Sequence, residues 1–311
     1  MSTTGIDRVT FGAEDLDAAR RFFADFGLTE HATDVAGATF TTIDGGQVRI
    51  LPSTASELPS AIEPGATLRE VIWGCADPQS LAETIAALRG IASLETGPDG
   101  IARCTDPNGL RLGFRVSQRK RVVVEPTAVN APGTPRRINQ PSLIDDVVKP
   151  INIGHVVLFV SDLEASSEFY QSRLGFVLSD RYPRAGVFLR CQPTGGHHNL
   201  FLLERPGKPG LNHVAFTVRD LHEVVRGGLA MSGKGWQTDI GPGRHPISSA
   251  LFWYLKSPCG GAVEYFADED YLTPEWQPRD LVRSPENYVE WAFAGGIDLK
   301  TRRQKQPGST A

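Results

Sequence analysis

With 311 residues, 40% of them hydrophobic, the chain is long enough for two domains with ample cores, and its formal net charge of −4 gives no reason to expect nucleic acid as a partner. Four scattered cysteines without a CxxC pair exclude a zinc ribbon and a disulfide framework and favour reduced thiols. No apolar run has the length of a membrane span, and the start, MSTTGIDRVT, lacks the apolar core of a signal peptide, so we expect a cytoplasmic protein without a membrane partner.

The first elements in the chain are a strand, a helix and a glycine that ends the helix, within residues 7–28 (DRVTFGAEDLDAARRFFADFGL). The Asp-Leu pair favours a helix start, and the glycine favours a helix stop. An apolar run at residues 68–77 (LREVIWGCAD) predicts a further strand. A Pro-Gly turn enters another strand at residues 106–114 (DPNGLRLGF).

A segment rich in proline and polar residues, EPTAVNAPGTPRRINQP, follows this first half. Such a composition is typical of an inter-domain linker. We therefore expect an N-terminal domain at residues 1–118, a linker at 119–150, a second domain at 151–270 and a C-terminal tail at 271–311.

The second half repeats the first. Residues 154–176 (GHVVLFVSDLEASSEFYQSRLGF), 211–220 (LNHVAFTVRD) and 257–265 (SPCGGAVEY) match the three stretches of the first half at similar offsets. A finer repeat lies inside the second half, where HVVLFVSDL recurs as HVAFTVRDL. The chain is therefore expected to contain four copies of a unit of strand, helix and further strands, two in each domain.

Three apolar strands of the second half each carry one polar residue. His155 and His213 open two of the runs, and Glu264 interrupts the third. A carboxylate in a covered strand is costly unless it is paired, protonated or bound to a metal. A single histidine at a strand start is more often structural. However, two imidazoles and one carboxylate on related strands form a facial triad that leaves coordination positions open and suits non-heme Fe(II).

The first half serves as an internal control for these three positions. There the repeat places Arg8, Glu70 and Gly113, two of which cannot hold a metal in this way. If the histidines and the glutamate were required by the repeating unit itself, the first half would carry them too. We therefore assign them to a function of the second half.

Further polar residues lie near the three strands. His197 and His198 precede an apolar strand, where a polar pair can also be part of a loop. His245 lies in a Gly/Pro-rich loop, GPGRHP, and Tyr254 lies ten residues before Glu264. We also regard Trp253, Phe188 and Val187 as candidates for the wall of a pocket.

These motifs, in this order, resemble those of the type I extradiol ring-cleaving dioxygenases, the catechol 2,3-dioxygenase and dihydroxybiphenyl dioxygenase group of the vicinal oxygen chelate superfamily. The resemblance covers residues 5–270, and its specific motifs lie in the second half. It implies an α+β fold of four βαβββ modules in two tandem domains. The turn before Glu264, Ser-Pro-Cys-Gly-Gly, departs from the usual Asp-Pro-x-Gly-Asn of that group.

The resemblance also implies roles for six residues. It implies that His155, His213 and Glu264 hold Fe(II), with Mn(II) as a less suitable substitute. It further implies that His198 is the pocket histidine that stabilises charge on oxygen and donates a proton, and that His245 and Tyr254 hydrogen-bond the ionised substrate oxygen.

The implied enzyme opens the ring of a catechol with O2 beside its two hydroxyl groups, in the breakdown of aromatic compounds, and is a homo-oligomer. Because no arginine or lysine stands out as a carboxylate clamp, we expect an uncharged catechol.

Two other functions remain open at this stage. A glyoxalase-like isomerase would use zinc or nickel and needs four protein ligands, with a second carboxylate. A ligand-binding member of the superfamily without enzymatic activity would need no metal. The tail, with Trp276 and Trp291, is expected either to dock onto the surface or to cover part of the active site.

Overall fold

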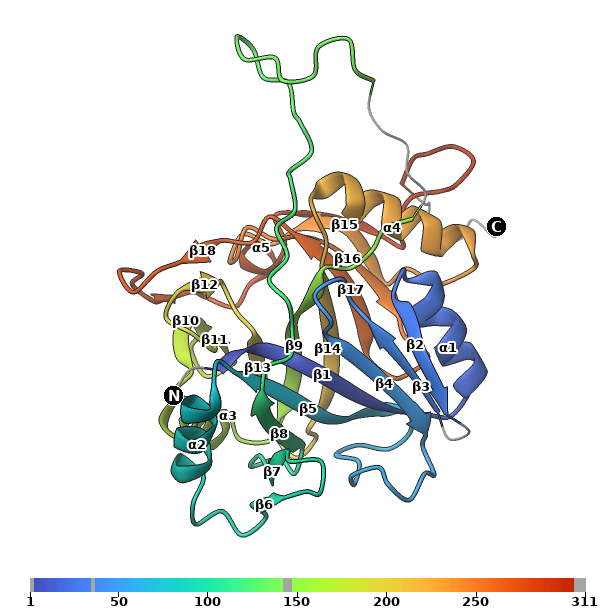
Figure 1. Ribbon diagram of the computed structural model, residues 1–311. Coiled ribbons are helices and arrows are strands. Elements are labelled where there is room, and N and C mark those ends of the chain that lie inside the picture. Colours follow the sequence, from blue (N-terminus) through green and yellow to red (C-terminus); the bar gives the residue numbers. More distant parts are fainter. Residues whose placement is uncertain (1–2, 35–36, 142–146, 305–311) are drawn as a thin grey trace.

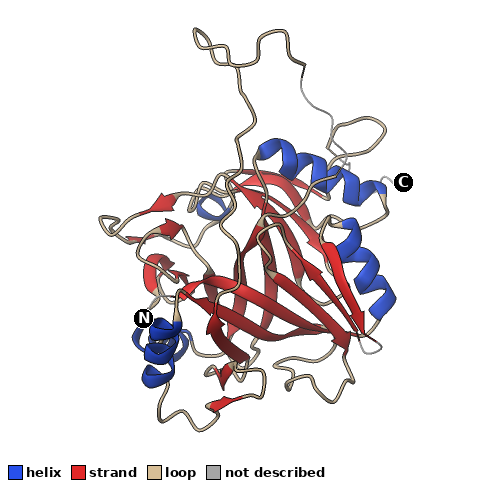
Figure 2. Ribbon diagram, in the orientation of Figure 1, coloured by secondary structure: helices blue, strands red, loops and turns tan. Residues whose placement is uncertain are grey.

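The computed structural model of the protein describes residues 3–34, 37–141 and 147–304. Within these residues the strands form two large mixed sheets in tandem, with helices on their outer faces (Figures 1 and 2). The first sheet has the order β2-β3-β4-β1-β5-β8-β7-β6, and the second has the order β19-β10-β11-β13-β9-β14-β17-β16-β15-β20. A small pair, β12-β18, lies beside them. The α+β architecture of tandem repeats predicted from the sequence is confirmed.

The first half contains the following elements: β1 (Thr3–Ala13), α1 (Leu16–Asp25), β2 (Thr29–Asp34), β3 (Gly37–Thr41), β4 (Gln47–Pro52), β5 (Thr67–Cys75), α2 (Pro78–Ala87), β6 (Glu95–Thr96), β7 (Ala102–Thr105) and β8 (Arg111–Val116).

The second half contains the following elements: β9 (Asn152–Val160), α3 (Leu163–Glu168), the π-helical turn η1 (Phe169–Arg173), β10 (Val177–Tyr182), β11 (Gly186–Arg190), β12 (Gly195–Gly196), β13 (Leu200–Glu204), β14 (Gly210–Thr217), α4 (Leu221–Gly233), β15 (Ile240–Arg244), β16 (Leu251–Lys256) and β17 (Ala262–Ala267). The segment after β17 adds β18 (Tyr271–Leu272), β19 (Arg279–Asp280), α5 (Pro285–Tyr288) and β20 (Trp291–Ala294).

The strand pairing of the two sheets is equivalent. In the first sheet β1 pairs parallel with β4 and antiparallel with β5, and β5 pairs parallel with β8. In the second sheet β9 pairs parallel with β13 and antiparallel with β14, and β14 pairs parallel with β17. The sequence repeat is therefore a repeat of strand pairing.

Local signals in the sequence fix the helix ends. The side chains of Asp15 and Asp162 each accept a hydrogen bond from a backbone N–H in the first turn of α1 and α3. Gly27 and Gly175 follow these helical segments with φ values of +94° and +71°, in the left-handed region where glycine carries no Cβ penalty. The predicted Asp-Leu starts and glycine stops are confirmed.

The two halves share one buried core. Phe26, at the end of α1, stacks on Tyr265 of β17 with ring centroids 3.9 Å apart, and it contacts Phe216 of β14 edge-on. The Tyr265 hydroxyl donates to the Phe26 carbonyl at 2.7 Å. Because side chains alternate along a strand, Tyr265 faces this core while its neighbour Glu264 faces the other side of the sheet. A helix of the first half thus supports a functional strand of the second.

On the second sheet, α4 approaches its strands closely because two adjacent glycines face them. A Cβ on Gly227 would press on the ring of Tyr265, and one on Gly228 would collide with the ring of Trp253. Glycine weakens a helix interior, so this close packing is the reason for its presence here. Trp253 is fully buried and donates from Nε1 to the Thr238 hydroxyl.

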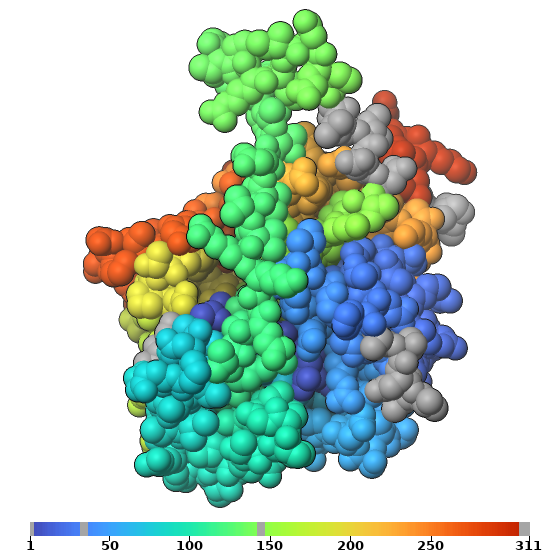
Figure 3. All heavy atoms as spheres, in the orientation of Figure 1, coloured from blue at the N-terminus to red at the C-terminus, as the bar shows by residue number. Residues whose placement is uncertain are grey.

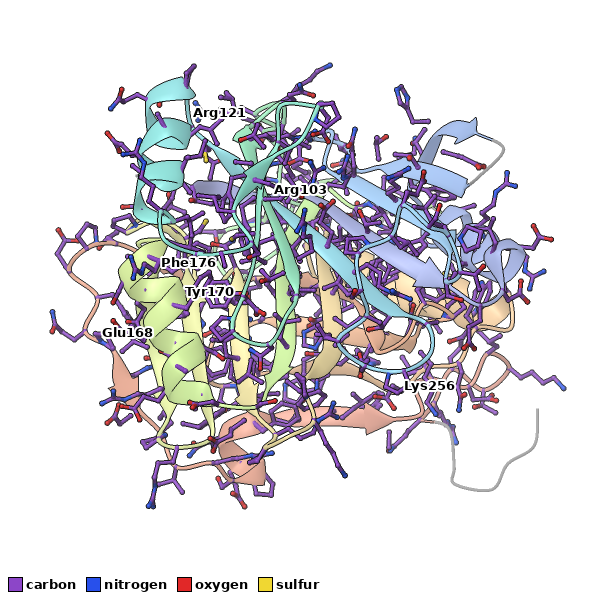
Figure 4. All side chains as sticks on the ribbon, turned by 90° about the horizontal axis from the view of Figure 1, so that it is seen from below. Arg103, Arg121, Glu168, Tyr170, Phe176 and Lys256 are labelled. Carbon is purple, nitrogen blue, oxygen red and sulfur yellow. The ribbon has the colours of Figure 1, made fainter. Side chains whose placement is uncertain are left out.

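A second contact between the halves lies at the opposite end of the sheets. Tyr170 and Phe176, both labelled in Figure 4, pack with ring centroids 5.7 Å apart, and Phe176 meets Trp73 of the first sheet edge-on. The Tyr170 hydroxyl donates to the buried carboxylate of Asp106, which belongs to the turn before β8. The two halves are therefore joined by polar as well as apolar contacts.

The segment between the two halves projects from the body in Figures 1 and 3. Residues 121–130 and 135–141 carry no helix or strand. The predicted linker at 119–150 lies partly outside the described residues, and its limits stay a prediction. No described helix is both long and apolar enough to cross a membrane.

The stacking of Phe26 on Tyr265 should carry a large part of the stability of the shared core. We expect Phe26→Ala to lower the free energy of unfolding by about 3–5 kcal/mol, because it removes a buried ring and leaves a cavity. Urea denaturation would measure this change in the free energy of unfolding. Tyr271→Ala, at a tyrosine that is 71% exposed, is the control and should change stability by less than about 0.5 kcal/mol. Equal effects of the two changes would contradict this role.

Candidate metal centre

Two histidines and one glutamate converge on the face of the second sheet opposite the shared core. His155 lies on β9, His213 on β14 and Glu264 on β17, three neighbouring strands near the middle of the sheet (Figure 1). Ala215 pairs with His155 on one side and with Glu264 on the other. His213 lies two residues before Ala215 and so shares its face. The register of three strands therefore brings these side chains together.

The three donor atoms lie within hydrogen-bonding distance of one another. The Nε2 atoms of His155 and His213 are 3.2 Å apart, and each is 3.1 Å from Oε2 of Glu264. All three side chains are buried. Two imidazole nitrogens and a carboxylate oxygen that meet in a small buried space are a donor set that suits a divalent cation.

The protonation states also fit a cation. Burial lowers the pKa of His155 to about 3, so its imidazole is neutral at pH 7. Burial raises the pKa of Glu264, but the contacts of its carboxylate with the imidazoles of His155 and His213 outweigh burial and hold the pKa below the usual range. His213 Nδ1 lies 2.6 Å from Oδ1 of Asn212, and because that oxygen accepts, Nδ1 carries the proton and Nε2 keeps its lone pair. The three residues form a divalent-metal site.

His198 stands beside this site at the end of a buried polar chain. Its ring lies 4.1 Å from that of His155, centroid to centroid, and its Nδ1 is 3.2 Å from Nδ1 of His197. His197 Nε2 in turn donates to Asp180 at 2.9 Å. Arg279 completes the chain, donating to Asp180 from its backbone N–H at 2.7 Å and from Nε at 3.0 Å.

This chain fixes the tautomer of His198. Hydrogen bonds from His197 and Arg279 hold the pKa of Asp180 below its usual range against the effect of burial. Burial lowers the pKa of His197, so this imidazole is neutral and, having donated from Nε2, accepts at Nδ1. His198 Nδ1 must therefore donate, and Glu269 Oε1, 3.1 Å away, shares its proton. The Nε2 atom of His198 therefore keeps its lone pair and can accept a hydrogen bond or a proton from a molecule in the cavity.

His245 and Tyr254 form a second hydrogen-bonded pair at the site. His245 Nδ1 donates to the Tyr288 carbonyl at 2.7 Å, so its Nε2 accepts from the Tyr254 hydroxyl at 3.0 Å. Burial lowers the pKa of His245 to about 4 and raises that of Tyr254 well above its usual value. Both groups are therefore neutral at pH 7. In the strand register, Tyr254 of β16 lies directly opposite Glu264 of β17.

These groups surround one cavity of about 490 Å³, counting the part open to solvent. Its polar groups gather at the metal site, and apolar side chains form the rest of its wall. The described residues that line it include no arginine and no lysine, so the cavity suits an uncharged, largely apolar molecule. The lining residues are His155, Val157, Phe188, His198, Phe201, Leu203, Asn212, His213, His245, Ile247, Ser248, Ala250, Tyr254, Glu264 and Tyr288.

The structure places all six residues singled out in the sequence around this cavity. Of the proposed wall residues, Phe188 lines the cavity, whereas Trp253 and Val187 do not. The expectation for Trp253 was wrong because its side chain faces α4 instead. His197 is also more than part of a loop, since it is fully buried between Asp180 and His198.

Sequence reasoning missed Asp180, Glu269 and Tyr288. Tyr288 lies on α5, in the tail that β19 and β20 add to the edges of the second sheet. Tyr288 lines the cavity, so this part of the tail covers the site. This agrees with the second of the two expectations for the tail, that it covers part of the active site. None of the three stands in a motif, and only the tertiary contacts reveal them.

Comparisons with known proteins agree with this geometry. Residues 152–265 match the family model of the Glyoxalase/Bleomycin resistance protein/Dioxygenase superfamily. Metapyrocatechase 2 of Cupriavidus necator is 35% identical over 142 residues, which are 46% of this chain and 44% of that protein. The iron-dependent extradiol dioxygenase of Rhodococcus jostii is 32% identical over 163 residues, 47% of this chain and 53% of that protein.

A 3-methylcatechol 2,3-dioxygenase of Pseudomonas putida is 28% identical over 190 residues, 57% of this chain and 59% of that protein. The alignments thus span about half the length of these curated relatives. Among solved structures, the Mn(II)-bound glyoxalase from Novosphingobium aromaticivorans superposes with a TM-score of 0.74 at 23% identity, covering 99% of this chain and 97% of that one. This likeness shows the fold. The similarity to the Glyoxalase/Bleomycin resistance protein/Dioxygenase superfamily model is confined to residues 152–265, the part of the chain that carries the metal site.

Proposed function

We propose that the protein is an Fe(II)-dependent extradiol dioxygenase that opens the ring of an uncharged catechol with O2. The observation that carries the proposal is the convergence of two imidazole nitrogens and one carboxylate oxygen at the wall of an apolar cavity. Bound ferrous iron would supply the Lewis-acid and redox chemistry that lets O2 react with an aromatic diol. His155, His213 and Glu264 would hold it.

In the overall reaction one carbon–carbon bond of the ring breaks beside the two hydroxyl groups, and both oxygen atoms of O2 enter the product. The apolar wall, with Phe188 and Phe201 stacked 3.7 Å apart, would hold the ring and exclude water. The absence of arginine and lysine among the described lining residues supports an uncharged ring over an acidic one.

His198 is our candidate for general acid–base catalysis. Its Nε2 has no proton in the neutral tautomer, so it can take a proton from the diol and later return it to a product oxygen. Glu269, which shares the proton on Nδ1, would stabilise the imidazolium formed in between. His197, Asp180 and Arg279 would hold the ring in this orientation.

The pair formed by His245 and Tyr254 is our candidate for holding the substrate oxygen. The Tyr254 hydroxyl lies beside the metal site, with its ring 4.9 Å from that of His213, centroid to centroid. Because His245 accepts its proton, the tyrosine oxygen is free to accept a hydrogen bond from a substrate hydroxyl. A neutral pair can adjust its hydrogen bonds to an ionised diol without adding charge to the cavity.

A glyoxalase-like isomerase is the alternative that the fold permits. It would need a second carboxylate at the metal; Glu269 pairs with His198, and its carboxylate lies within 4.8 Å of a ring nitrogen of His155 without joining the group formed by His155, His213 and Glu264. Oxygen uptake with a catechol, followed by electrode on anaerobically iron-loaded protein, tests the proposal. No uptake across monocyclic and bicyclic catechols would reject it.

Removal of a ligand tests the metal site separately from turnover. Glu264→Gln should lose iron, because an amide is a much weaker ligand than a carboxylate, whereas Glu269→Gln should keep it. Iron content after anaerobic reconstitution gives the readout. Loss of iron from both variants would indicate a fourth ligand and favour the isomerase, and full iron in Glu264→Gln would remove this residue from the site.

The acid–base role of His198 predicts a loss of rate without a loss of metal. His198→Gln should lower kcat by roughly 10²–10⁴-fold at unchanged iron content. His197→Phe removes the acceptor behind His198 and should lower kcat by roughly 10–100-fold with a smaller change in KM. The exposed His222→Gln is the matched control. Turnover of His198→Gln at the control's rate would exclude the role.

The depressed pKa of His245 predicts that the metal-free protein loses stability in acid. The unfolded state takes up a proton on this residue below pH 6.5, whereas the folded state does so only near pH 4, so stability falls as the pH falls between these values. The free energy of unfolding should drop by about 2 kcal/mol between pH 7 and pH 5 from this residue. Urea titrations should show a correspondingly smaller drop in His245→Gln, and an equal drop would contradict the assignment.

A further inference from the structure

The first sheet contains a cleft at the place that corresponds to the metal-site cavity of the second. Because the strand pairing of the two sheets is equivalent, each position in one sheet has a defined counterpart in the other. Five cleft residues occupy the places of five cavity residues: Arg8 that of His155, Thr10 that of Val157, Arg49 that of Phe201, Glu70 that of His213 and Arg103 that of Tyr254.

The chemistry of the cleft differs from that of the cavity. The cleft encloses about 1140 Å³, counting the part open to solvent, and is lined by charged side chains. Four arginines face three carboxylates there. The lining includes neither a histidine nor a cysteine, nor any aromatic ring, among the described residues. The charged lining residues are Arg8, Arg49, Arg103, Arg111, Glu57, Glu70 and Asp99.

A rigid ion-pair cluster forms the floor of the cleft. Glu70 is 5% exposed and accepts from Arg103 Nε at 2.8 Å and from Arg8 Nη2 at 3.1 Å. Arg103, labelled in Figure 4, also makes a two-point contact with Asp99 at 2.8 and 2.6 Å. The Nε, Nη1 and Nη2 atoms of Arg103 therefore all donate to carboxylates. The floor fixes the position of Arg8.

Two buried polar atoms near this floor have no partner among the described residues. They are Nε of Arg8 and Oγ1 of Thr10, and Thr10 is only 2% exposed. A buried polar atom without a hydrogen bond is costly, so such atoms in a cleft mark where a ligand or water binds. Burial lowers the pKa of Arg8 despite Glu70, so a further anion would stabilise the guanidinium.

Two further arginines of the cleft, Arg49 and Arg111, form ion pairs with solvent-exposed carboxylates. Arg49 pairs with Glu57 and Arg111 with Glu95, and these two carboxylates are 49% and 61% exposed at the side chain. Ion pairs this exposed contribute little to stability, so a bound anion can replace them. Each guanidinium carries five N–H donors in a planar fork that matches a carboxylate or phosphate group.

We propose that this cleft is a second small-molecule site, which binds an oxyanion, a carboxylate or phosphate group, through Arg8, Arg49, Arg111 and the Thr10 hydroxyl. The ion pairs with Glu70 balance charge at the floor and hold Arg8 beside Thr10. Arg49 and Arg111 would contact the anion from the open side of the cleft. Among the residues that the structure describes, the cleft lining includes no aromatic ring and no group that could hold a metal ion, so its ligand differs from that of the metal cavity. The proposal does not depend on the activity of the metal site.

Calorimetric titration of the full-length, metal-loaded protein tests this site, with inorganic phosphate and succinate as separate probes in low-chloride buffer. We expect one saturable site per chain for at least one probe, in roughly the millimolar range. Arg49→Gln and Arg111→Gln should each weaken binding by roughly tenfold or more, because each removes a charge-assisted contact. Arg20→Gln, at an exposed arginine that pairs with Glu30 elsewhere in this half, should leave it unchanged.

Three results would overturn the proposal. These are no saturable heat with either probe, equal weakening by Arg20→Gln, or loss of binding in Glu264→Gln, which would place the anion at the metal instead. A thermal melt checks that each variant is folded. If a glutamine variant does not fold, Arg49→Lys keeps the charge without the planar fork and should still weaken binding, and unchanged binding in that variant would count against the site.

Discussion

The register of β14 between β9 and β17 is the constraint on which the site depends. It sets Ala215 opposite both His155 and Glu264, and it places His213 two residues away on the same face. A shift of one residue in either pairing would turn a ligand to the other side of the sheet. That other side is occupied by the shared core, where Tyr265 stacks on Phe26 of the first half. Core packing and ligand geometry therefore fix the same register.

The duplicated unit shows how one pairing pattern carries two chemistries. In the second sheet the central strands hold imidazoles and a carboxylate beside an apolar cavity. At equivalent positions in the first sheet, arginines and carboxylates bind each other. The backbone supplies the same concave surface twice, and the side chains decide whether it suits a cation or an anion. The first half also supplies α1, without which β17 would lose the aromatic contact behind Glu264.

The polar groups behind His198 come from distant parts of the chain. Asp180 lies on β10, His197 beside β12 and Arg279 on β19, and the pairing of Asp180 with Arg279 joins the tail to the sheet. Buried charges of this kind need partners, since an unpaired one would be neutralised or would destabilise the fold. The tail therefore has two roles here: it covers the cavity through Tyr288, and it balances the charge that orients His198.

The sequence by itself determined the repeat and the helix ends, and it singled out His155, His213 and Glu264, whereas His198, His245 and Tyr254 were indicated by the resemblance to a known family. These features are local: an apolar run, an Asp cap or a glycine stop depends on neighbours within a few residues, and the comparison of the halves exposed the positions that depart from the unit. The burial of Trp253 against α4, the chain from Arg279 to His198 and the partnerless donors in the first sheet were decided by tertiary structure alone. Each arises from contacts between residues far apart in sequence, and no repeat or motif in this sequence indicates which distant side chains these residues meet.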